Sequence, residues 1–424
     1  MLPVARLVQA RRVVATAQPR PPTAPATIVL LVATALFINY IDRGNLATAA
    51  PLMKGELRLS ATQLGVLLSA FYYTYVLAMF PAGWLAERYG AHIVLAIGVA
   101  IWSVATFLTG FVNSFAALLA LRLLLGLGES AGFPCASKLL AQSVIPGRLG
   151  LANGVMSFGY LLGPAVGTLI GGLLMAAYGW RPVFIVFGAL SIAWLIPWRS
   201  VVVGPAPAGA SPVTSAPSLR QILGQRALWG AAIGLFSANY SFYFILAWLP
   251  IYLVESRGFS VRTMSVVAST SYALTALGAL GYGWLTDHWL RSGWSTGVVY
   301  KGVMALNHVI GITCMIAMTV LPSGGAIAAL FVYEIMAGLA SPGLYAIPQI
   351  IAGPSAAGRW VGIHNCVGAL AGILAPALTG ILIDRTGGFA AAFTLAAAVG
   401  VIGLVAWLIV LPRIAPIRWS PVAQ

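Results

Sequence analysis

The chain has 424 residues, of which 60% are hydrophobic and only 7% are charged, and its formal net charge is +15. Because a soluble domain carries about 25% charged residues, this chain cannot cover a water-facing surface, and we expect most of its outer surface to face lipid. This excludes a soluble enzyme and a catalytic domain outside the membrane. The positive charges stand in short loops between apolar runs, a distribution that membrane orientation and anionic lipids explain better than nucleic acid does.

Apolar runs long enough to cross a bilayer recur along the whole chain. A spanning helix needs about 20 apolar residues, and runs of this length leave room for roughly twelve. The sequence therefore predicts an all-α polytopic membrane protein, with twelve transmembrane helices in two six-helix repeats. The predicted spans are 27–52, 61–86, 91–112, 114–142, 149–178, 181–203, 227–255, 263–290, 301–321, 324–352, 358–384 and 389–412.

One long polar interval, rich in Pro, Ala and Ser, divides these spans into two groups of six. It predicts a flexible linker between two helical bundles. The N-terminal segment is basic and lacks the apolar core of a signal peptide, which indicates a cytoplasmic tail. The predicted parts are the N-terminal tail at 1–26, the first bundle at 27–203, the linker at 204–226, the second bundle at 227–412 and the C-terminal tail at 413–424.

The basic residues favour one orientation in the membrane. Of the 23 Lys and Arg residues, 14 fall on the cytoplasmic side if both termini are cytoplasmic, and 6 fall on the opposite side. Since positive residues concentrate on the cytoplasmic side, we expect a multi-pass protein of the bacterial inner membrane with both termini in the cytoplasm. The remaining 3 basic residues stand within spans and are Arg43, Arg122 and Lys138.

The two groups of spans resemble each other in sequence. The segment from Gly83 to Gly90, after the second span, reads Gly-Trp-Leu-Ala-Glu-Arg-Tyr-Gly, and the segment from Gly283 to His288, after the eighth, reads Gly-Trp-Leu-Thr-Asp-His. Two parallel six-helix repeats joined by a linker are the internal symmetry of transporters that rock one bundle against the other.

At these motifs the chain resembles the major facilitator superfamily over essentially its full length. The Gly83 to Gly90 segment matches the superfamily signature G-x-L-a-D/E-R-x-G. Further motifs resemble the anion:cation symporter family within it, which takes up organic acids such as aldonates, aldarates, hexuronates and aromatic carboxylates. They are Asn39 to Arg43 in the first span, Phe71 to Tyr75 in the second, Arg122 with Glu129 and Pro134 in the fourth, and Trp248 to Leu253 in the seventh.

The resemblance also implies a conformational gate in the two repeated segments. In the superfamily the acid of this loop docks near a neighbouring helix terminus and holds the cytoplasmic side closed. In the second half Asp287 corresponds to it, although His288 replaces the usual arginine. The predicted gate residues are Gly83, Glu87, Arg88, Gly90 and Asp287.

Arg43 is the predicted ligand of a substrate carboxylate. A charge within the bilayer costs about 2.5–3.5 kcal/mol on insertion scales, so an embedded ionisable residue points to function. An arginine meets a carboxylate with two parallel hydrogen bonds and does not lose its proton, and the resemblance implies the same role for Arg43. The alternative is a structural ion pair with Asp42 or with a neighbouring helix.

Asp42 and Glu129 are the predicted proton carriers, and Arg122 is predicted to take part in the same proton coupling. Burial favours the neutral form of a carboxylic acid and a nearby arginine favours the charged form, so the gain or loss of an arginine partner changes protonation. We expect protonation of Asp42 to free Arg43 for the substrate. Arg122 and Glu129 are seven residues apart and share a helix face, which allows them to exchange partners. The alternative is a static gate or packing pair.

Polar and aromatic residues of other spans are predicted to shape the pocket, although such residues often bond only to a neighbouring helix. The family places a substrate-contacting tyrosine at Tyr75 and often a second asparagine four residues after Asn365, where this chain has Ala369. Glu334 in the tenth span either faces the cavity as an extra proton site or pairs with a distant cation. The predicted substrate-binding residues are Arg43, Tyr40, Tyr75, Asn239, Tyr243 and Asn365.

The leading hypothesis is uptake of an organic anion, a sugar acid, by a monomer that uses protons and no cofactor, with Na⁺ coupling left open. The alternatives are proton-driven efflux of a drug or metabolite, and a membrane receptor or scaffold. The embedded arginines favour an anion, because antiporters for cations usually need embedded acids without a cavity arginine. The sequence has no Ser/His/Asp set, phosphate loop or metal cluster, so we expect no enzyme and no metal site.

Overall fold

The computed structural model describes residues 23–144, 149–201 and 217–419, and these residues form helices without a strand. The described residues contain 12 helices that are long and apolar enough to cross a membrane, which confirms the predicted fold class. The α-helices are α1 (Pro25–Glu56), α2 (Ala61–Tyr89), α3 (Ala91–Thr109), α4 (Phe115–Glu129), α5 (Gly132–Ser143), α6 (Leu149–Tyr178), α7 (Trp180–Ala193), α8 (Leu195–Trp198), α9 (Leu219–Leu223), α10 (Arg226–Ile251), α11 (Val261–Arg291), α12 (Thr296–Val320), α13 (Ser323–Thr386) and α14 (Ala390–Val405). The π-helical turns η3 (Tyr252–Ser256) and η4 (Ala406–Val410) follow α10 and α14.

The fourth span differs from the prediction in its continuity, because it is interrupted between α4 and α5 after a stretch that contains two glycines. The tenth and eleventh predicted spans carry the single label α13, and a kink separates them at Gly353, whose φ of 66° lies in the left-handed region. Glycine adopts this conformation without the steric cost that a side chain adds, so the chain turns there. We call Ser323–Gly353 the first arm of α13 and Arg359–Thr386 its second arm.

The predicted linker contains a short helix that its composition did not indicate. Ser218 and Gln221 form a capping box, in which Ser218 Oγ accepts from the Gln221 N–H (3.3 Å) and Gln221 Oε1 accepts from the Ser218 N–H (2.8 Å). Such a box satisfies N–H groups that the first helical turn leaves without partners, and it starts α9. The other predicted linker and tail residues at 1–22, 202–216 and 420–424 lie outside the described residues.

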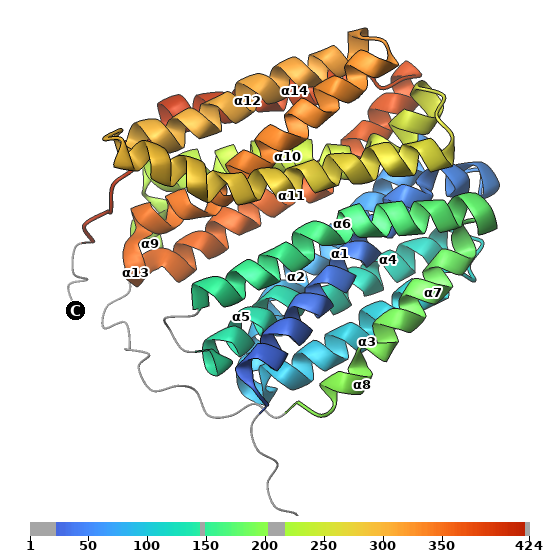
Figure 1. The fold of residues 1–424 in the computed structure, drawn as a ribbon, viewed down its shortest axis with the longest axis horizontal. Helices are drawn as coiled ribbons and strands as arrows, with labels where there is room; N and C mark the ends of the chain where they lie inside the picture. The colour runs from blue at the N-terminus through green and yellow to red at the C-terminus, as the bar shows by residue number, and fades with distance from the viewer. Residues whose placement is uncertain (1–22, 145–148, 202–216, 420–424) are drawn as a thin grey trace, which may run out of the picture.

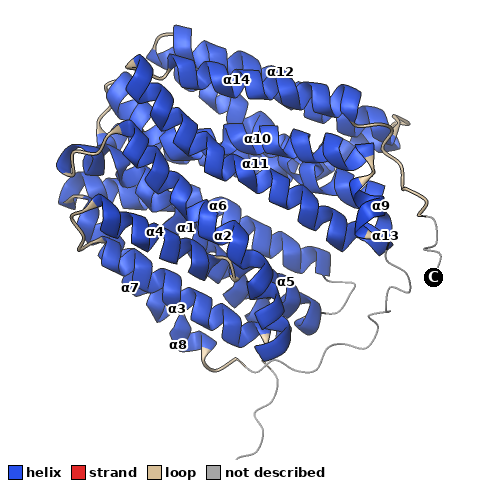
Figure 2. Ribbon diagram, turned by 180° about the vertical axis from the view of Figure 1, so that it is seen from behind, coloured by secondary structure: helices blue, strands red, loops and turns tan. Residues whose placement is uncertain are grey.

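Figures 1 and 2 show two groups of helices side by side, α1 to α8 in one half and α9 to η4 in the other. In the first half α1 packs on α6 and α3 on α7, and in the second α10 packs on α13 and α12 on α14. The halves meet along α1, α2 and α6 on one side and α10, α11 and α13 on the other. A site at this boundary is therefore built mainly from these six inner helices.

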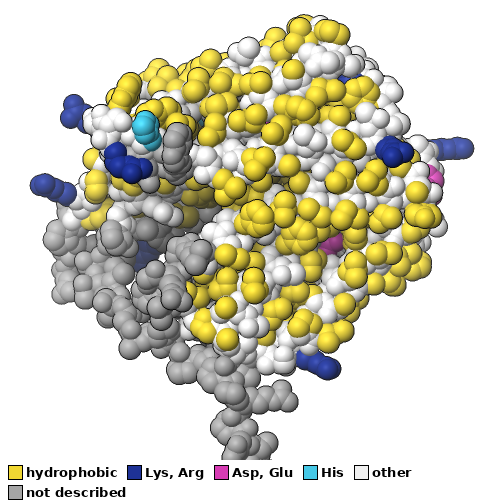
Figure 3. Space-filling view, viewed as in Figure 1, with side chains coloured by type: hydrophobic (Ala, Val, Ile, Leu, Met, Phe, Trp, Pro, Cys, Tyr) yellow, Lys and Arg dark blue, Asp and Glu magenta, His cyan; other side chains and the backbone are white. Residues whose placement is uncertain are grey.

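Large hydrophobic side chains cover the outer surface of the helices. The face drawn in Figure 3 is mostly hydrophobic, and the Lys and Arg side chains that it shows lie at its edges. Leu77 and Phe80 of α2 are 76% and 86% exposed, and many other large hydrophobic residues are exposed with them. Soluble monomers rarely expose apolar patches of this extent, so the protein spans the membrane several times.

Polar contacts join the two halves at the end of the molecule where α1 ends and α2 begins, which we call the α1–α2 end. Lys54 Nζ lies 2.7 Å from Glu255 Oε2 of η3. Asp384 in the second arm of α13 accepts hydrogen bonds from the N–H groups of Ala61 (3.0 Å) and Thr62 (2.7 Å). The first N–H groups of a helix have no partner within it, so a carboxylate of one half caps a helix of the other and complements its dipole.

Two serine hydroxyls continue this junction toward the middle of the helices. Ser69 of α2 donates to the carbonyl oxygen of Ile373 in the second arm of α13, at 2.8 Å. Ser269 of α11 donates to the carbonyl oxygen of Ala165 in α6, also at 2.8 Å. The halves are therefore in contact from the α1–α2 end to the level of these serines.

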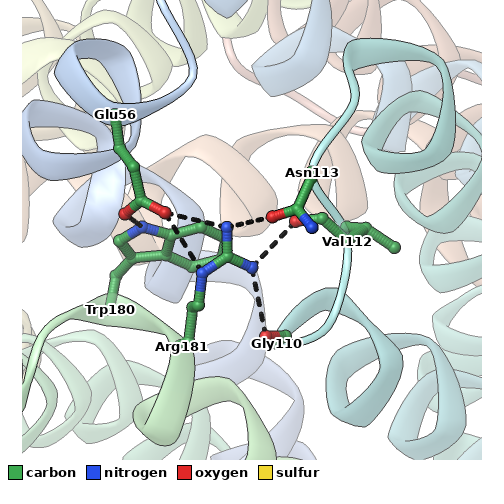
Figure 4. Close-up of polar contacts among 6 residues, drawn as sticks. All are labelled: Glu56, Gly110, Val112, Asn113, Trp180 and Arg181. Carbon is green, nitrogen blue, oxygen red and sulfur yellow. Dashed lines mark hydrogen bonds and ion pairs between the residues drawn. The ribbon is translucent and has the colours of Figure 1, made fainter.

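A polar network around Arg181 fixes the same end of the first half (Figure 4). Arg181, at the start of α7, donates to Glu56 Oε1 at the end of α1 at 2.8 Å, and Trp180 Nε1 donates to Glu56 Oε2 at 2.6 Å. The planar guanidinium also reaches the loop between α3 and α4, where its partners are Gly110, Val112 and Asn113. Because a guanidinium presents its donors in one rigid plane, Arg181 ties three separate segments together.

Candidate functional site

Arg43 and Glu129 form a buried ion pair between the first and fourth spans. Arg43 of α1 is 7% exposed and Glu129, the last residue of α4, is 1% exposed. Arg43 Nη2 and Nε lie 3.0 and 3.2 Å from Glu129 Oε2, and Nη2 also donates to Asn39 Oδ1 at 3.2 Å. Loss of one partner would leave a buried charge without compensation, which is strongly destabilising. The sequence predicted a role for each residue but not their contact with each other.

The predicted pairing of Asp42 with Arg43 is wrong. Asp42 is buried, but its carboxylate accepts hydrogen bonds from Ser191 Oγ of α7 (3.1 Å) and Asn45 Nδ2 (3.4 Å). Adjacent residues of an α-helix point about 100° apart, so Asp42 faces α7 whereas Arg43 faces α4. Protonation of Asp42 therefore does not release Arg43 directly. The role of Asp42 as a proton carrier stays a prediction.

Three aromatic rings surround the guanidinium of Arg43. Its central carbon lies 4.5, 4.6 and 4.8 Å from the ring centroids of Tyr40, Phe71 and Tyr75. A cation this close to aromatic rings is attracted by their π electrons, and the attraction grows when water is excluded. Tyr75, which was predicted to contact the substrate, contacts Arg43 in this structure.

Arg122 of α4 is a second buried cation, at 6% exposed. Its Nε donates to the carbonyl oxygen of Leu67 (3.3 Å), and its guanidinium carbon lies 5.5 Å from the centroid of the Phe71 ring. Within the described ranges, no carboxylate lies at ion-pair distance from Arg122. The Phe71 ring thus contacts two cations, of which only Arg43 has an acidic partner here.

A cavity of about 150 Å³ lies at the boundary between the halves. Tyr40 of α1 and Tyr160 of α6 line it from the first half, and residues of α10 to α14 line it from the second. Among the predicted substrate-binding residues, Tyr40, Asn239 and Tyr243 are part of this lining. Those that stand outside it are Arg43, Tyr75 and Asn365.

Tyr40 connects the buried ion pair with the cavity. Its ring contacts the Arg43 guanidinium, lines the cavity and lies 5.2 Å from the Tyr160 ring, centroid to centroid. Across the boundary between the halves, the rings of Tyr72 and Tyr243 lie 4.7 Å apart. Tyr40 therefore contacts both the cavity and the Arg43 guanidinium.

The two asparagines of the second half lie where α10 meets the second arm of α13. Asn239 Nδ2 donates to the carbonyl oxygen of Gly368 at 3.0 Å and lines the cavity. Asn365 is three residues before Gly368 on the second arm and is half-buried. The binding role of Asn365 stays a prediction.

Sequence analysis missed most of the polar lining contributed by the second half. The helices that carry these residues were predicted, but the side that each helix turns toward the cavity depends on packing between segments far apart in the chain. The available signal was the presence of polar groups within otherwise apolar spans. The main missed residues are Tyr160, Tyr272, Thr275, Asn307, His308 and Tyr345.

Glu334 of the first arm of α13 is buried beside the cavity, at 2% exposed. Its Oε2 accepts a hydrogen bond from the hydroxyl of Thr275 in α11, and both Thr275 and the adjacent Tyr333 line the cavity. No Lys or Arg of the described segments lies at ion-pair distance from Glu334. Glu334 itself is not part of the cavity lining, and its role as an extra proton site stays a prediction.

Of the predicted gate residues, the structure describes the side chain of Arg88 and the glycines Gly83 and Gly90. Arg88 is exposed and its guanidinium carbon lies 5.4 Å from the ring centroid of Trp84. Gly90 has a φ of 94° at the turn from α2 to α3, a conformation that suits glycine. The gate function stays a prediction, and the side chains of Glu87 and Asp287 lie outside the described residues.

Lys138 is anchored near the end of α2. This residue of α5 donates from Nζ to the carbonyl oxygen of Ala86 at 2.9 Å. This carbonyl oxygen also accepts from the N–H of Gly90 at 3.2 Å, and the helix dipole favours a cation at the end of a helix. Lys138, one of the three basic residues predicted within spans, therefore joins two helices of the first half.

Comparison with known proteins agrees with this architecture. The family model of the Major Facilitator Superfamily matches residues 32–376. A hexuronate transporter of Bacillus subtilis is 30% identical over 412 residues, which cover 93% of this chain and 96% of that protein. A probable sulfoacetate transporter of Cupriavidus necator is 30% identical over 396 residues, which cover 89% of this chain and 91% of that protein.

Solved structures share the fold. A bacterial homologue of the human lysosomal transporter Spinster, crystallised in an inward-facing and unoccupied conformation, aligns with a TM-score of 0.74 and 22% identity. The alignment covers 91% of this chain and 95% of that chain. At this identity the likeness concerns the fold alone.

Proposed function

This chain belongs to the major facilitator superfamily, and on that basis we propose that it takes up a sugar acid, such as an aldonate, aldarate or hexuronate, by proton symport and alternating access. The family and the similar proteins are transporters rather than enzymes. Hexuronate and sulfoacetate, the substrates in the names of two relatives, are both organic anions. They support an organic anion as the substrate class.

The observation that carries the proposal is the buried pair of Arg43 and Glu129 behind the tyrosines of the cavity. Among the described residues Arg43 has one carboxylate partner, whose Oε2 accepts from both Nε and Nη2, and a substrate carboxylate offers acceptor oxygens of the same kind to the same guanidinium. When Glu129 takes up a proton it loses its charge, and Arg43 is free to bind the substrate. Binding of the anion and binding of the proton are then coupled through one arginine. This competition replaces the one that the sequence predicted between Arg43 and Asp42.

The junction between the halves supports an assignment of the conformation. The positive-inside rule puts the α1–α2 end, with Lys54 and Asp384, on the extracellular side. The halves are in contact at this end, so we assign the structure to a state closed to the outside. Substrate release to the cytoplasm follows from this state. We assign both termini to the cytoplasmic side of the bacterial inner membrane, and the working unit to a monomer without a cofactor.

Uptake into proteoliposomes with an imposed inward proton gradient tests this function. The panel consists of galactonate, glucarate, glucuronate, phthalate and glutamate. We expect concentrative uptake of at least one acid, which a protonophore abolishes and Arg43→Ala reduces at least about 100-fold, because the variant leaves Glu129 and the substrate without their buried cation. Arg385→Ala, an exposed arginine near the end of α13, is the matched control and should retain uptake.

The same vesicles distinguish the competing functions. Export of cationic dyes that is driven by the proton gradient and survives Arg43→Ala would establish efflux in place of uptake. Uptake that follows a sodium gradient and ignores the proton gradient would keep the anion and replace the coupling ion. Absence of every substrate-dependent flux from folded protein would favour the receptor or scaffold.

A further inference from the structure

Two adjacent polar residues of an outer helix reach the cavity from the second half. Asn307 and His308 stand in the middle of α12, at 7% and 4% exposed, and both line the cavity. α12 packs on α13 and α14 and lies away from the boundary between the halves (Figure 1). The cavity therefore extends from the boundary into the second half, where it passes Gly311 of α12 and Gly400 of α14.

The His308 ring presents a hydrogen-bond acceptor on one side. Its Nδ1 lies 2.8 Å from the carbonyl oxygen of Met304, which only accepts, so Nδ1 carries the hydrogen. In the neutral ring Nε2 then carries a lone pair. Nε2 is buried and has no hydrogen-bond partner among the residues that the structure describes. Nε2 lies close to Gly403 of α14, and a side chain at position 403 would collide with it.

Two further acceptor atoms accompany Nε2. Asn307 Oδ1 is also buried, and no described residue bonds to it. Ser237 of α10 also lines the cavity and lies against Gly403. It donates its hydroxyl hydrogen to the carbonyl oxygen of Val399 at 2.6 Å, which leaves its oxygen lone pairs for other donors. Buried polar atoms are normally hydrogen-bonded, so two unpartnered acceptors on residues that line one part of the cavity, with the Ser237 oxygen beside them, favour a ligand that supplies donors.

We propose that Asn307, His308 and Ser237 form a subsite for the hydroxyl groups of a polyhydroxylated acid. A hydroxyl group is a neutral donor, and all three atoms can accept a hydrogen bond from it. A carboxylate has no hydrogen to donate and would be repelled by their lone pairs. The buried cations Arg43 and Arg122 stand in the first half, so the substrate carboxylate points toward that half and its hydroxyl-bearing end points toward α12. This inference rests on the proposed uptake of a sugar acid and locates the residues that bind its hydroxyl groups.

Matched pairs of acids test the subsite by calorimetric binding to the purified full-length protein. Galactarate and adipate share a six-carbon dicarboxylate skeleton and differ in four hydroxyl groups, and galactonate and hexanoate form a similar monocarboxylate pair. Each hydrogen bond lost from a buried site weakens binding about three- to ten-fold. We expect the wild type to prefer the hydroxylated acid of a pair at least about ten-fold, and Asn307→Leu and His308→Phe to reduce that preference to about three-fold or less.

Three further variants control for packing. His308→Gln keeps an acceptor oxygen and should retain part of the preference. Ser237→Ala removes a lone pair with little change in volume, which keeps the test valid if a larger substitution fails to fold. His92→Phe, the same exchange near the start of α3 and outside the cavity lining, should leave every affinity unchanged.

The outcomes separate this inference from the proposed function. A wild type that binds adipate or hexanoate as tightly as the hydroxylated partner would overturn the subsite and leave organic-anion uptake intact, as would variants that keep the wild-type preference. Equal loss of affinity for both members of a pair would assign the three residues to packing alone. A folded wild type that neither binds nor transports any acid would instead overturn the proposed function.

Discussion

Among the described residues, Arg43 has one acidic partner and three aromatic neighbours. Whether its positive charge is compensated therefore depends on Glu129. The rings of Tyr40, Phe71 and Tyr75 lie close to its guanidinium, while Glu129 supplies the counter-charge. A proton that neutralises Glu129 therefore leaves the buried positive charge of Arg43 without compensation. Such a charge is stabilised by an incoming carboxylate far more than an arginine at the surface would be.

Glu129→Gln should separate transport from coupling. Glutamine neither carries the negative charge nor takes up the proton, so Arg43 is available to substrate at any pH. We expect exchange of labelled for unlabelled substrate across the vesicle membrane to persist within a few-fold. Accumulation driven by the proton gradient should fall to the equilibrium level. A Glu129→Gln protein that still accumulates substrate with proton uptake would refute the competition between Glu129 and the substrate.

The ionisable residues of the first half were predictable from sequence because charge is rare in an apolar span. The partners of these residues were not predictable from the sequence. Adjacency along the chain suggested that Asp42 pairs with Arg43. Neighbouring residues of a helix point in different directions, however, and Asp42 accepts a hydrogen bond from Ser191 instead. Asn307 and His308 carried no spacing that marks a site, and only the packing of α12 brings them to the cavity.

At the scale of helices, close contacts depend on glycines that leave room for a neighbouring backbone. Gly188 of α7 is an example in the first half, far from the cavity lining. A side chain at this position would meet the backbone nitrogen and Cα of Phe107 in α3. The packing of α3 on α7 thus requires that no side chain stand between them.

Gly188→Ala should destabilise the protein without changing its selectivity. Overpacking at a tight contact costs about 1–3 kcal/mol, so we expect a lower melting temperature for the detergent-purified variant and unchanged relative affinities. Gly302→Ala on α12 is the control, since no atom lies near its added methyl group. Alanine is the better helix former, and the control should be as stable as the wild type. Equal melting temperatures for both variants would contradict the tight contact.

The positions of the spans were predictable within a few residues because hydropathy alone determines which segments enter a bilayer. The breaks within and between the spans were not predictable in this way. The kink at Gly353 separates the tenth and eleventh spans, and the interruption at Ser130 divides the fourth. Both depend on local backbone geometry, which hydropathy does not record. The capping box that starts α9 was a local signal present in the linker sequence, hidden by its overall composition.

At the scale of the whole molecule, the contact of Lys54 with Glu255 joins the two halves at the α1–α2 end. Lys54→Glu converts attraction into repulsion and should weaken the closed state. Because both side chains are partly exposed, the effect is modest: an exposed pair contributes about 0.2–1 kcal/mol, so we expect the uptake rate to fall by up to about five-fold. Raised salt should reduce the difference from the wild type.

A charge swap checks that the pair itself is responsible. Lys54→Glu combined with Glu255→Lys should recover the wild-type rate, whereas Glu255→Lys alone should impair uptake as Lys54→Glu does. Arg262→Glu, a charge reversal at an exposed position near the start of α11, should have little effect. A double variant slower than either single variant would show that the two side chains do not act through each other.

The buried pair of Arg43 and Glu129 also determines how the membrane voltage acts on uptake. The pair is neutral as a whole, and it stays neutral when one proton neutralises Glu129 and one carboxylate replaces it on Arg43. A monocarboxylate taken up with one proton would therefore move no net charge, and its accumulation would follow the proton concentration ratio alone. A dicarboxylate would bring one negative charge into a cell whose interior is negative. Each 100 mV would then oppose its uptake by about 2.3 kcal/mol, so this carrier would be electroneutral for aldonates and electrogenic for aldarates.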